Sequence, residues 1–185
     1  LEDDYPTGLD SRVSDLESSS YRLTSKRHIS AWHFGSTRFL PSIMPSTEIS
    51  LILLKPDTVS KGRCGEILKR FEAQGFKVRG MKMMRLSSEI LAEHYSHLAD
   101  KPFFPTIVEF MQSAPVVAVA LSGENAISRV RDLLGPTDST KADKGTIRGD
   151  LGEDMMVNCA HASDSPESAA AELKRFFAEG EVLDH

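Results

Sequence analysis

The run Pro115-Val116-Val117-Ala118-Val119-Ala120-Leu121 is continuously apolar and has the length of a single strand. A strand with one solvated face would alternate apolar and polar residues, so this run predicts a strand buried on both faces. A second short apolar run, Ile49 to Leu54, ends at Lys55-Pro56 and predicts another buried strand. Two buried strands of this kind indicate a sheet that is covered by helices.

Working outward from these runs, helices and strands alternate along the chain. Gly75 ends one predicted helix, a strand changes phase near Gly80, and Ser165-Pro166 supplies the cap and first turn of the last helix. We expect helices within residues 67–75, 90–98, 104–111, 126–134 and 165–177, and further strands within 76–86 and 157–161. The order is β-α-β-β-α-β with added helices, which predicts an α+β, ferredoxin-like sandwich. It would have a four-stranded antiparallel sheet covered by helices, an extra helical hairpin and a long active-site loop over residues 136–154.

The chain divides near residue 45. Residues 1–17 carry six acidic residues and one basic residue, whereas residues 18–47 contain no acidic residue and hold basic residues among many serines and threonines. Neither part has periodicity, so we predict that residues 1–44 are a disordered extension and that residues 45–185 are the domain. Residues 18–43 also have the composition of a mitochondrial transit segment. If Met44 is the true start, the prefix is not native. We expect a cytoplasmic protein, with a mitochondrial location as the alternative.

Composition excludes several classes of protein. The formal net charge is −5, so binding of nucleic acid by bulk electrostatics is not expected. The two cysteines form no C-x-x-C pair, which argues against a zinc site or a disulfide scaffold. No apolar run approaches the roughly 18 residues that a membrane span needs. Phosphate binding would therefore depend on a few well-placed basic residues.

His161 is the first residue with a possible chemical function. It ends an apolar strand and comes just before a helix N-terminus, where unpaired N–H groups favour an anion. Glu172 follows eleven residues later on that helix and could orient the imidazole, and a histidine held by a carboxylate can act as a nucleophile. The alternative is that a lone histidine is structural, which is the more common case.

Basic residues in and beside the long loop form the second candidate site. Arginine grips phosphate with two parallel hydrogen bonds, so Arg131 and Arg148, with the Thr137 hydroxyl, could hold a polyphosphate. The alternative is a solvated charged loop. Lys55 at its strand end is a weak signal alone, and neither a Walker A sequence nor a G-x-G-x-x-G is present, so a P-loop is excluded. Phe103 or its neighbour could stack on a base.

Taken together, these segments resemble the nucleoside diphosphate kinase family. The matching stretches are Leu53–Asp57, His94-Tyr95, Lys101–Pro105, Ser113–Val117, Gly145–Asp150 and Asn158–Ser165. The resemblance runs in register from about residue 48 to residue 183. It implies a phosphotransferase that moves the γ-phosphate from a nucleoside triphosphate to a nucleoside diphosphate and so maintains nucleoside triphosphate pools. The transfer would be ping-pong through a phosphohistidine.

The resemblance implies a set of catalytic residues. His161 would take the phosphoryl group, and Glu172 and Ser163 would fix its ring. Lys55 and Asn158 would contact the sugar 3′-hydroxyl.

The resemblance also implies how the nucleotide is held. The phosphates would contact Arg131, Thr137 and Arg148, with Tyr95 nearby, and the base would lie between Phe103 and Met155. The implied cofactor is Mg²⁺, bound by the nucleotide phosphates, with Asp164 reaching it through water. The partners would be nucleoside di- and triphosphates, with ATP as the main donor.

Assembly as a homo-oligomer, tetramer or hexamer, is implied too. Three residues depart from the common family pattern: Lys144 for Pro, Val157 for Arg and Ala162 for Gly. None removes a catalytic group, but Lys144 lies in a segment that packs between subunits in hexamers, so we favour a tetramer. Two other functions are possible alternatives, a catalytically silent relative and a ferredoxin-like nucleic-acid binder. The first would lack His161 or Glu172, and the second would need a basic face.

Overall fold

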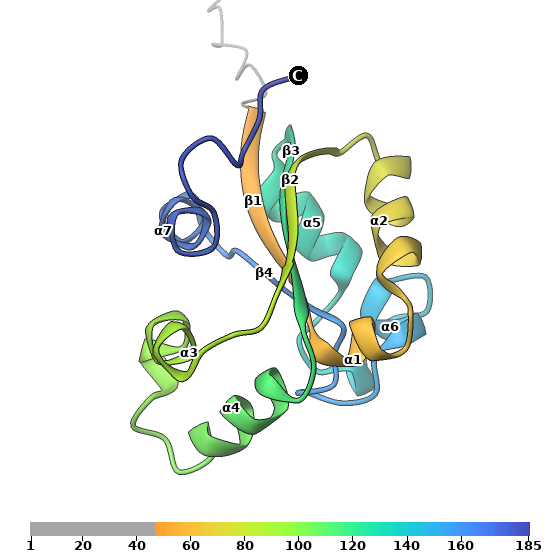
Figure 1. Ribbon diagram of the computed structural model, residues 1–185. Coiled ribbons are helices and arrows are strands. Elements are labelled where there is room, and N and C mark those ends of the chain that lie inside the picture. Colours follow the sequence, from red (N-terminus) through yellow and green to blue (C-terminus); the bar gives the residue numbers. More distant parts are fainter. Residues whose placement is uncertain (1–46) are drawn as a thin grey trace, which may run out of the picture. The chain divides into compact units, whose positions relative to one another are not determined.

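In the computed structural model, which describes residues 47–185, a four-stranded sheet has the strand order β2-β3-β1-β4 (Figure 1). The strands are β1 (Thr47–Leu54), β2 (Lys77–Met84), β3 (Val116–Glu124) and β4 (Ala160–Ala162). Each neighbouring pair is antiparallel. This is the predicted α+β, ferredoxin-like arrangement, which is confirmed. The predicted disorder of residues 1–44 concerns a segment outside the described residues.

Seven α-helices accompany the sheet in the described part of the chain. They are α1 (Pro56–Ser60), α2 (Cys64–Ala73), α3 (Ser88–His94), α4 (Phe104–Gln112), α5 (Ala126–Leu134), α6 (Ile147–Leu151) and α7 (Pro166–Phe176). Two 3₁₀ turns cover Ser96–Leu98 and Ser139–Lys141. None of the helices between residues 47 and 185 is long and apolar enough to cross a membrane.

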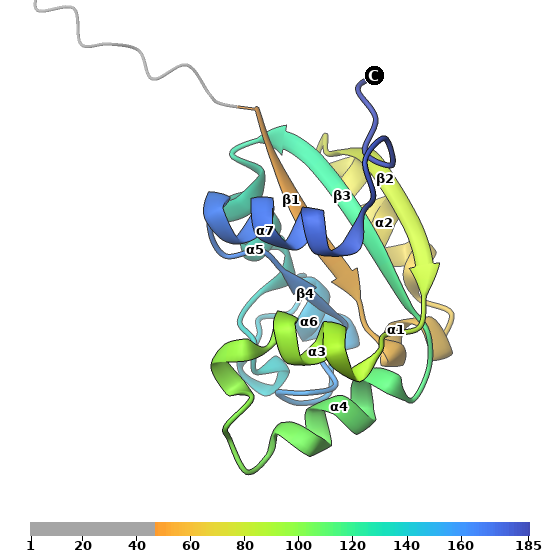
Figure 2. The ribbon, with the colours of Figure 1, turned by 60° about the vertical axis from the view of Figure 1, so that its left-hand side comes forward.

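The two faces of the sheet bury separate apolar clusters. Ile52 and Leu54 of β1 pack with α2 and α5, whereas Leu51 and Leu53 pack with α3, α4 and α7. Successive side chains of a strand point to opposite faces, so one continuously apolar strand serves both clusters. Figure 2 shows α3 and α7 on the near side of the sheet and α2 on the far side. The prediction that the central strands are buried on both faces is confirmed.

Gly80 explains the predicted change of phase in β2. The register against β3 shifts between Val78 and Gly80, which is a β-bulge. A Cβ at Gly80 would lie 2.6 Å from the carbonyl oxygen of Glu181, so only glycine allows the chain end to pack here.

The prediction of a strand over residues 157–161 is wrong in its limits, because β4 covers only Ala160–Ala162. Cys159 has a φ of 72°, in the left-handed region that interrupts strand pairing. Its backbone is held there on both sides: the N–H donates to Asp57 Oδ2 at 3.0 Å, and the carbonyl accepts from Thr58 Oγ1 at 2.8 Å. Helix α1 and the helical turns within residues 136–154 were also not predicted.

Candidate active site

A pocket of about 870 Å³ lies beside the strand end that carries His161. Its walls come from α3, α4, α5, the 136–158 segment and α7. Eleven of the twelve residues singled out from the sequence line it: Lys55, Tyr95, Phe103, Arg131, Thr137, Arg148, Met155, Asn158, His161, Asp164 and Glu172. Ser163 lies behind the wall, where it bonds to Glu172. Residues that are far apart in the sequence thus share one cavity.

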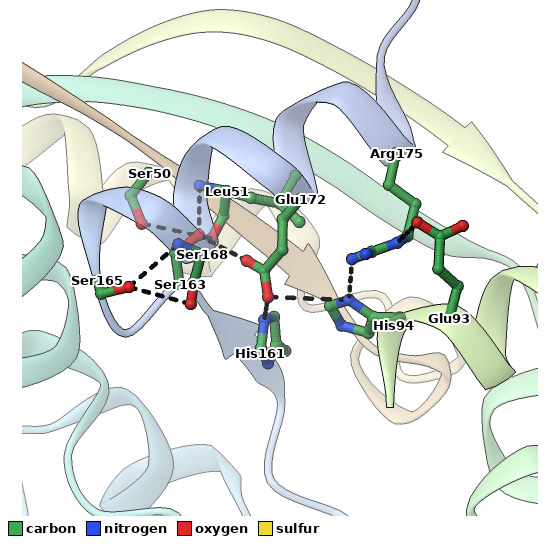
Figure 3. A network of polar contacts seen from close by, with 10 residues as sticks. All are labelled: Ser50, Leu51, Glu93, His94, His161, Ser163, Ser165, Ser168, Glu172 and Arg175. Carbon is green, nitrogen blue, oxygen red and sulfur yellow. Dashed lines mark hydrogen bonds and ion pairs between the residues drawn. The ribbon is translucent and has the colours of Figure 1, made fainter. Parts of the chain in front are cut away.

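One nitrogen of the His161 imidazole is held by a hydrogen bond. Its Nε2 lies 2.8 Å from Glu172 Oε1, and the Ser163 hydroxyl donates to Glu172 Oε2 at 2.6 Å (Figure 3). The carboxylate therefore has a fixed orientation and holds the ring through Nε2. Within residues 47–185, Nδ1 of His161 has no such partner, which leaves its lone pair available when Nε2 carries the proton.

Local structure explains how Glu172 reaches the histidine. The Ser165 hydroxyl caps α7 by accepting from the Ser168 N–H at 3.0 Å, and Pro166 occupies the first turn. Two turns further on, Glu172 points back toward β4. Ser163 is itself fixed to β1, since its hydroxyl accepts from the Leu51 N–H at 3.1 Å.

The carboxylate of Glu172 is kept ionised although it is buried. Burial raises the pKa of this group, but the hydrogen bonds from His161 and Ser163 outweigh the effect, so the pKa lies below its ordinary value. A negative carboxylate stabilises positive charge on the imidazole and accepts a hydrogen bond from its Nε2–H. This is the arrangement that makes a histidine nucleophilic at its other nitrogen.

Lys55 and Asn158 form a bonded pair in the floor of the pocket. The Lys55 ammonium donates to Asn158 Oδ1 at 2.6 Å and to the Met156 carbonyl at 3.2 Å. The amide nitrogen of Asn158 donates in turn to the carbonyls of Thr137 and Met155. Burial and the nearby Arg148 lower the pKa of Lys55 to about 8. The Lys55 ammonium and the Asn158 amide are therefore held in place, where they can form hydrogen bonds to a small polar group.

Arg148 contributes a buried positive charge. Thr146 caps α6 by accepting from the Gly149 N–H at 3.1 Å, and this short helix turns Arg148 inward. Its guanidinium donates to the carbonyls of Gly135, Asn158 and Ala160. Burial and Arg131 lower the pKa of Arg148 to about 10. Its partners are neutral carbonyls, so the positive charge faces the pocket uncompensated and favours an anion.

The mouth of the pocket is apolar on two sides. Phe103, at the start of α4, is 51% exposed, and Met155 is 62% exposed. Both line the cavity. Tyr95 lies deeper, and burial raises the pKa of its phenol, which therefore stays protonated and can donate a hydrogen bond. The cavity thus passes from apolar faces at its mouth to cations and His161 inside.

Two places in the site could bind a metal ion. Asp164 is exposed beside His161, and a hydrogen bond from Ser168 lowers its pKa, so it offers an ionised carboxylate. His94, His161 and Glu172 place ligand atoms within 4.8 Å of one another. However, the Arg175 guanidinium lies 3.3 Å from His94 Nδ1 and opposes a second cation there. Asp164 is the better candidate.

The comparison with known proteins identifies the family. The sequence model described as "Nucleoside diphosphate kinase" matches residues 48–182. This chain belongs to the nucleoside diphosphate kinase family. A relative from Staphylothermus marinus is 48% identical over 139 residues, which are 75% of this chain and 99% of the relative. One from Rubrobacter xylanophilus is 52% identical over 130 residues, 70% of this chain and 98% of the relative.

Solved structures agree with the family assignment. The Aquifex aeolicus nucleoside diphosphate kinase is 45% identical with a TM-score of 0.71, covering 75% of this chain and 100% of that one. The Halobacterium salinarum enzyme, solved in complex with CDP, is 40% identical with a TM-score of 0.73, covering 76% and 93%. Both comparisons support the nucleotide kinase over the alternative of a nucleic-acid binder with a similar fold.

Two residues at the site carried no prediction from the sequence. His94 lies edge-on to His161 with ring centroids 4.5 Å apart, and Arg175 contacts His94. One signal was available for Arg175, which follows Glu172 by three residues on a predicted helix and therefore shares its face. His94 belongs to the matching stretch His94-Tyr95, but the resemblance implies a role only for Tyr95.

Proposed function

We propose that this chain is an active nucleoside diphosphate kinase that carries the phosphoryl group on Nδ1 of His161. The observation that carries the proposal is the Glu172 contact with Nε2, which leaves Nδ1 free in a pocket lined by cations. A silent relative would have lost part of this arrangement. Both Glu172 and Ser163 are in place to hold the ring.

The proposed reaction has two half-reactions in one site. In the first, Nδ1 of His161 forms a bond to the γ-phosphorus of a nucleoside triphosphate. The bond between that phosphorus and the bridging oxygen breaks, and the nucleoside diphosphate leaves with the electron pair. A second diphosphate then enters, and its terminal oxygen takes the phosphoryl group from the histidine. Arg131, Arg148 and Thr137 would hold the phosphates in line, which is the main requirement of phosphoryl transfer.

The sugar and base would occupy the remaining parts of the pocket. Lys55 and Asn158, fixed by their mutual hydrogen bond, would meet the 3′-hydroxyl, with Tyr95 near the phosphates. Phe103 and Met155 would cover the two faces of the base, because both are exposed at the mouth. Such a site provides apolar surfaces for the base to pack against and few hydrogen-bonding partners, so it would accept both purines and pyrimidines. ATP would be the main donor.

The family's requirement for a divalent cation is met in our proposal by Mg²⁺. Bound Mg²⁺ would supply charge neutralisation across the phosphates. The ionised Asp164 carboxylate would hold it through water, in keeping with the reluctance of this ion to lose its hydration shell.

We further propose that the chain forms a homo-oligomer, and we favour a tetramer over a hexamer. β2 is an edge strand, and its Met81 and Met83 are 55% and 62% exposed. An exposed edge with two large apolar side chains is a surface that natural proteins normally cover. A second copy of β2 would extend the sheet and bury these methionines. Light scattering at micromolar concentration tests this, and a monomer would contradict it.

We propose that residues 45–185 are the catalytic domain and that residues 18–43 direct the chain to an organelle, in place of a cytoplasmic location. A relative named "Nucleoside diphosphate kinase 2, chloroplastic" from Pisum sativum is 42% identical over 170 residues, 90% of this chain. That match extends into the residues before 47. The basic, acid-free composition of residues 18–43 supports import. A fluorescent fusion of residues 1–46 tests it, and diffuse cytoplasmic signal would contradict it.

Steady-state kinetics with ATP and GDP test the proposed activity. A ping-pong enzyme gives parallel lines in double-reciprocal plots, and it exchanges label between ATP and ADP with no second nucleoside present. His161→Ala should lose both activities while circular dichroism stays unchanged. Exchange by the pure His161→Ala variant would overturn the proposal.

A further inference from the structure

His94 is a buried histidine in contact with the proposed nucleophile, and the reaction above gives it no task. Its side chain is 0% exposed, and its ring meets His161 and Phe176 edge to face at 4.5 and 5.2 Å. Its Nδ1 lies 3.8 Å from Glu172 Oε1, the same oxygen that holds His161 (Figure 3). Two imidazoles therefore face one carboxylate oxygen.

Arg175 determines which of the two can bond to that oxygen. Its guanidinium Nη1 lies 3.3 Å from His94 Nδ1, and Glu93 forms an ion pair with its Nε at 2.9 Å. Arginine is a donor only and does not lose its charge. Nδ1 of His94 must then be the acceptor, so the single proton of a neutral His94 sits on Nε2. That Nε2 is buried with no hydrogen-bond partner among residues 47–185.

A protonated His94 would compete for the carboxylate. Its Nδ1–H would face Arg175, which repels it, and Glu172 Oε1, which attracts it. A small movement would close the 3.8 Å gap to a charge-assisted hydrogen bond. Glu172 Oε1 would then move away from Nε2 of His161. The negative charge of the carboxylate would be compensated by His94 instead of by His161.

We propose that Arg175 is a positioning residue for phosphoryl transfer, which holds His94 in its neutral, Nε2-protonated form so that Glu172 stays bonded to His161. The proposal rests on the proposed function of His161. Arg175 does not touch the reacting atoms. It acts through His94. Glu93 on α3 forms an ion pair with the guanidinium of Arg175 on α7 and so helps to hold it in place.

The charged and titratable groups around His94 support this assignment. They are Glu172 and Arg175 from α7, His161 from β4, Glu93 and Tyr95 from the end of α3, and His97 from the following turn. Burial comes first among the effects that lower the pKa of His94 to about 3, followed by His161 and Arg175, while Glu172 raises it. Removal of Arg175 would take away one of the positive groups that oppose Glu172 and would raise the pKa of His94, while burial and His161 would still lower it.

The test is the pH profile of kcat/KM for Arg175→Met, which keeps the chain length and apolar stem but removes the charge. We expect a modest loss at pH 8 and a larger loss at pH 5.5, because the neutral fraction of His94 falls about tenfold for each unit by which the pH lies below its pKa. Arg175→Lys should restore much of the parent profile. Lys174→Met is the matched control, since this exposed neighbour on α7 also loses a positive charge. The double variant Arg175→Met with His94→Gln should lack the extra acid loss.

Nitrogen NMR of the histidine rings gives a second readout that does not need a variant. In the parent at pH 6, His94 should carry its proton on Nε2 alone, and in Arg175→Met its Nδ1 should become protonated at a higher pH than in the parent. A parent His94 protonated at Nδ1, or an Arg175→Met profile parallel to the parent's, would overturn the inference. Inactivity of the parent at pH 8 would instead overturn the proposed function, so the two failures are distinguishable.

Discussion

Replacement of His94 by glutamine should remove a specific loss of stability in acid. Burial and neighbouring positive groups lower the pKa of His94 to about 3 in the folded chain, against about 6.5 for an unfolded histidine. The unfolded state therefore binds more protons between pH 3 and pH 6.5. In that window stability rises with pH, and it is lost as the pH falls from 6.5 toward 3.

The size of the effect follows from the two pKa values. Each pH unit inside the window changes the free energy of unfolding by about 1.36 kcal/mol for one such group. From pH 6.5 to pH 5.0 the contribution of His94 is thus about 2 kcal/mol. Because the side chain is 0% exposed, solvent screening does not reduce it greatly. His94→Gln also loses packing against Phe176, but that loss is the same at every pH.

Urea denaturation at pH 5.0, 6.0 and 7.5 provides the assay. The parent should lose about 2 kcal/mol more than His94→Gln between pH 7.5 and pH 5.0. All samples need one protein concentration, since subunit association also stabilises the folded state. His97→Gln, at an exposed histidine nearby, is the control and should keep the parent slope. Equal slopes for the parent and His94→Gln would refute the reasoning, because His94 would then be free to take a proton.

Three further predictions concern the reaction. Glu172→Ala should slow transfer less than His161→Ala does, since the carboxylate orients the ring without reacting; a larger loss in single-turnover assays would contradict that. 3′-Deoxy-ATP should phosphorylate the protein about ten- to hundredfold more slowly than dATP at saturation, as expected for a charge-assisted hydrogen bond of about 1.5–3 kcal/mol to the leaving oxygen; equal rates would refute the assignment of Lys55 and Asn158. Steady-state kinetics should show less than hundredfold preference among bases, because the exposed Phe103 and Met155 offer only stacking.

The parts of the fold that the sequence predicted are those with a strong local signal. Residues 116–121 of the apolar run form the first part of β3, and Ser165-Pro166 caps and opens α7 as expected. The spacing between His161 and Glu172 also indicated their contact, because a helix that starts at Pro166 must bring one face back to the preceding strand. In each case the residue types and the backbone geometry point to the same structure.

The remaining features depend on long-range contacts. α6 is one short helix held by its Thr146 cap and by Arg148, whose carbonyl partners lie on other segments. The left-handed backbone conformation of Cys159 is stabilised by Asp57 and Thr58, which lie about a hundred residues earlier in the chain. No local sequence pattern therefore indicates it. The meeting of His94 with Arg175 likewise requires α3 and α7 to lie on the same face of the sheet. Spacing alone does not fix such a contact.

The most direct test of the account is to find where the phosphoryl group resides. The protein, incubated with γ-labelled ATP and Mg²⁺ and then separated from nucleotide, should carry label that is stable in base and labile in acid. Peptide mapping should place it on His161, and phosphorus–nitrogen NMR coupling should place it on Nδ1, because Glu172 occupies Nε2. Addition of GDP should then remove the label as GTP. Label on Nε2 or on another residue, or its absence from a folded and nucleotide-binding protein, would contradict the account.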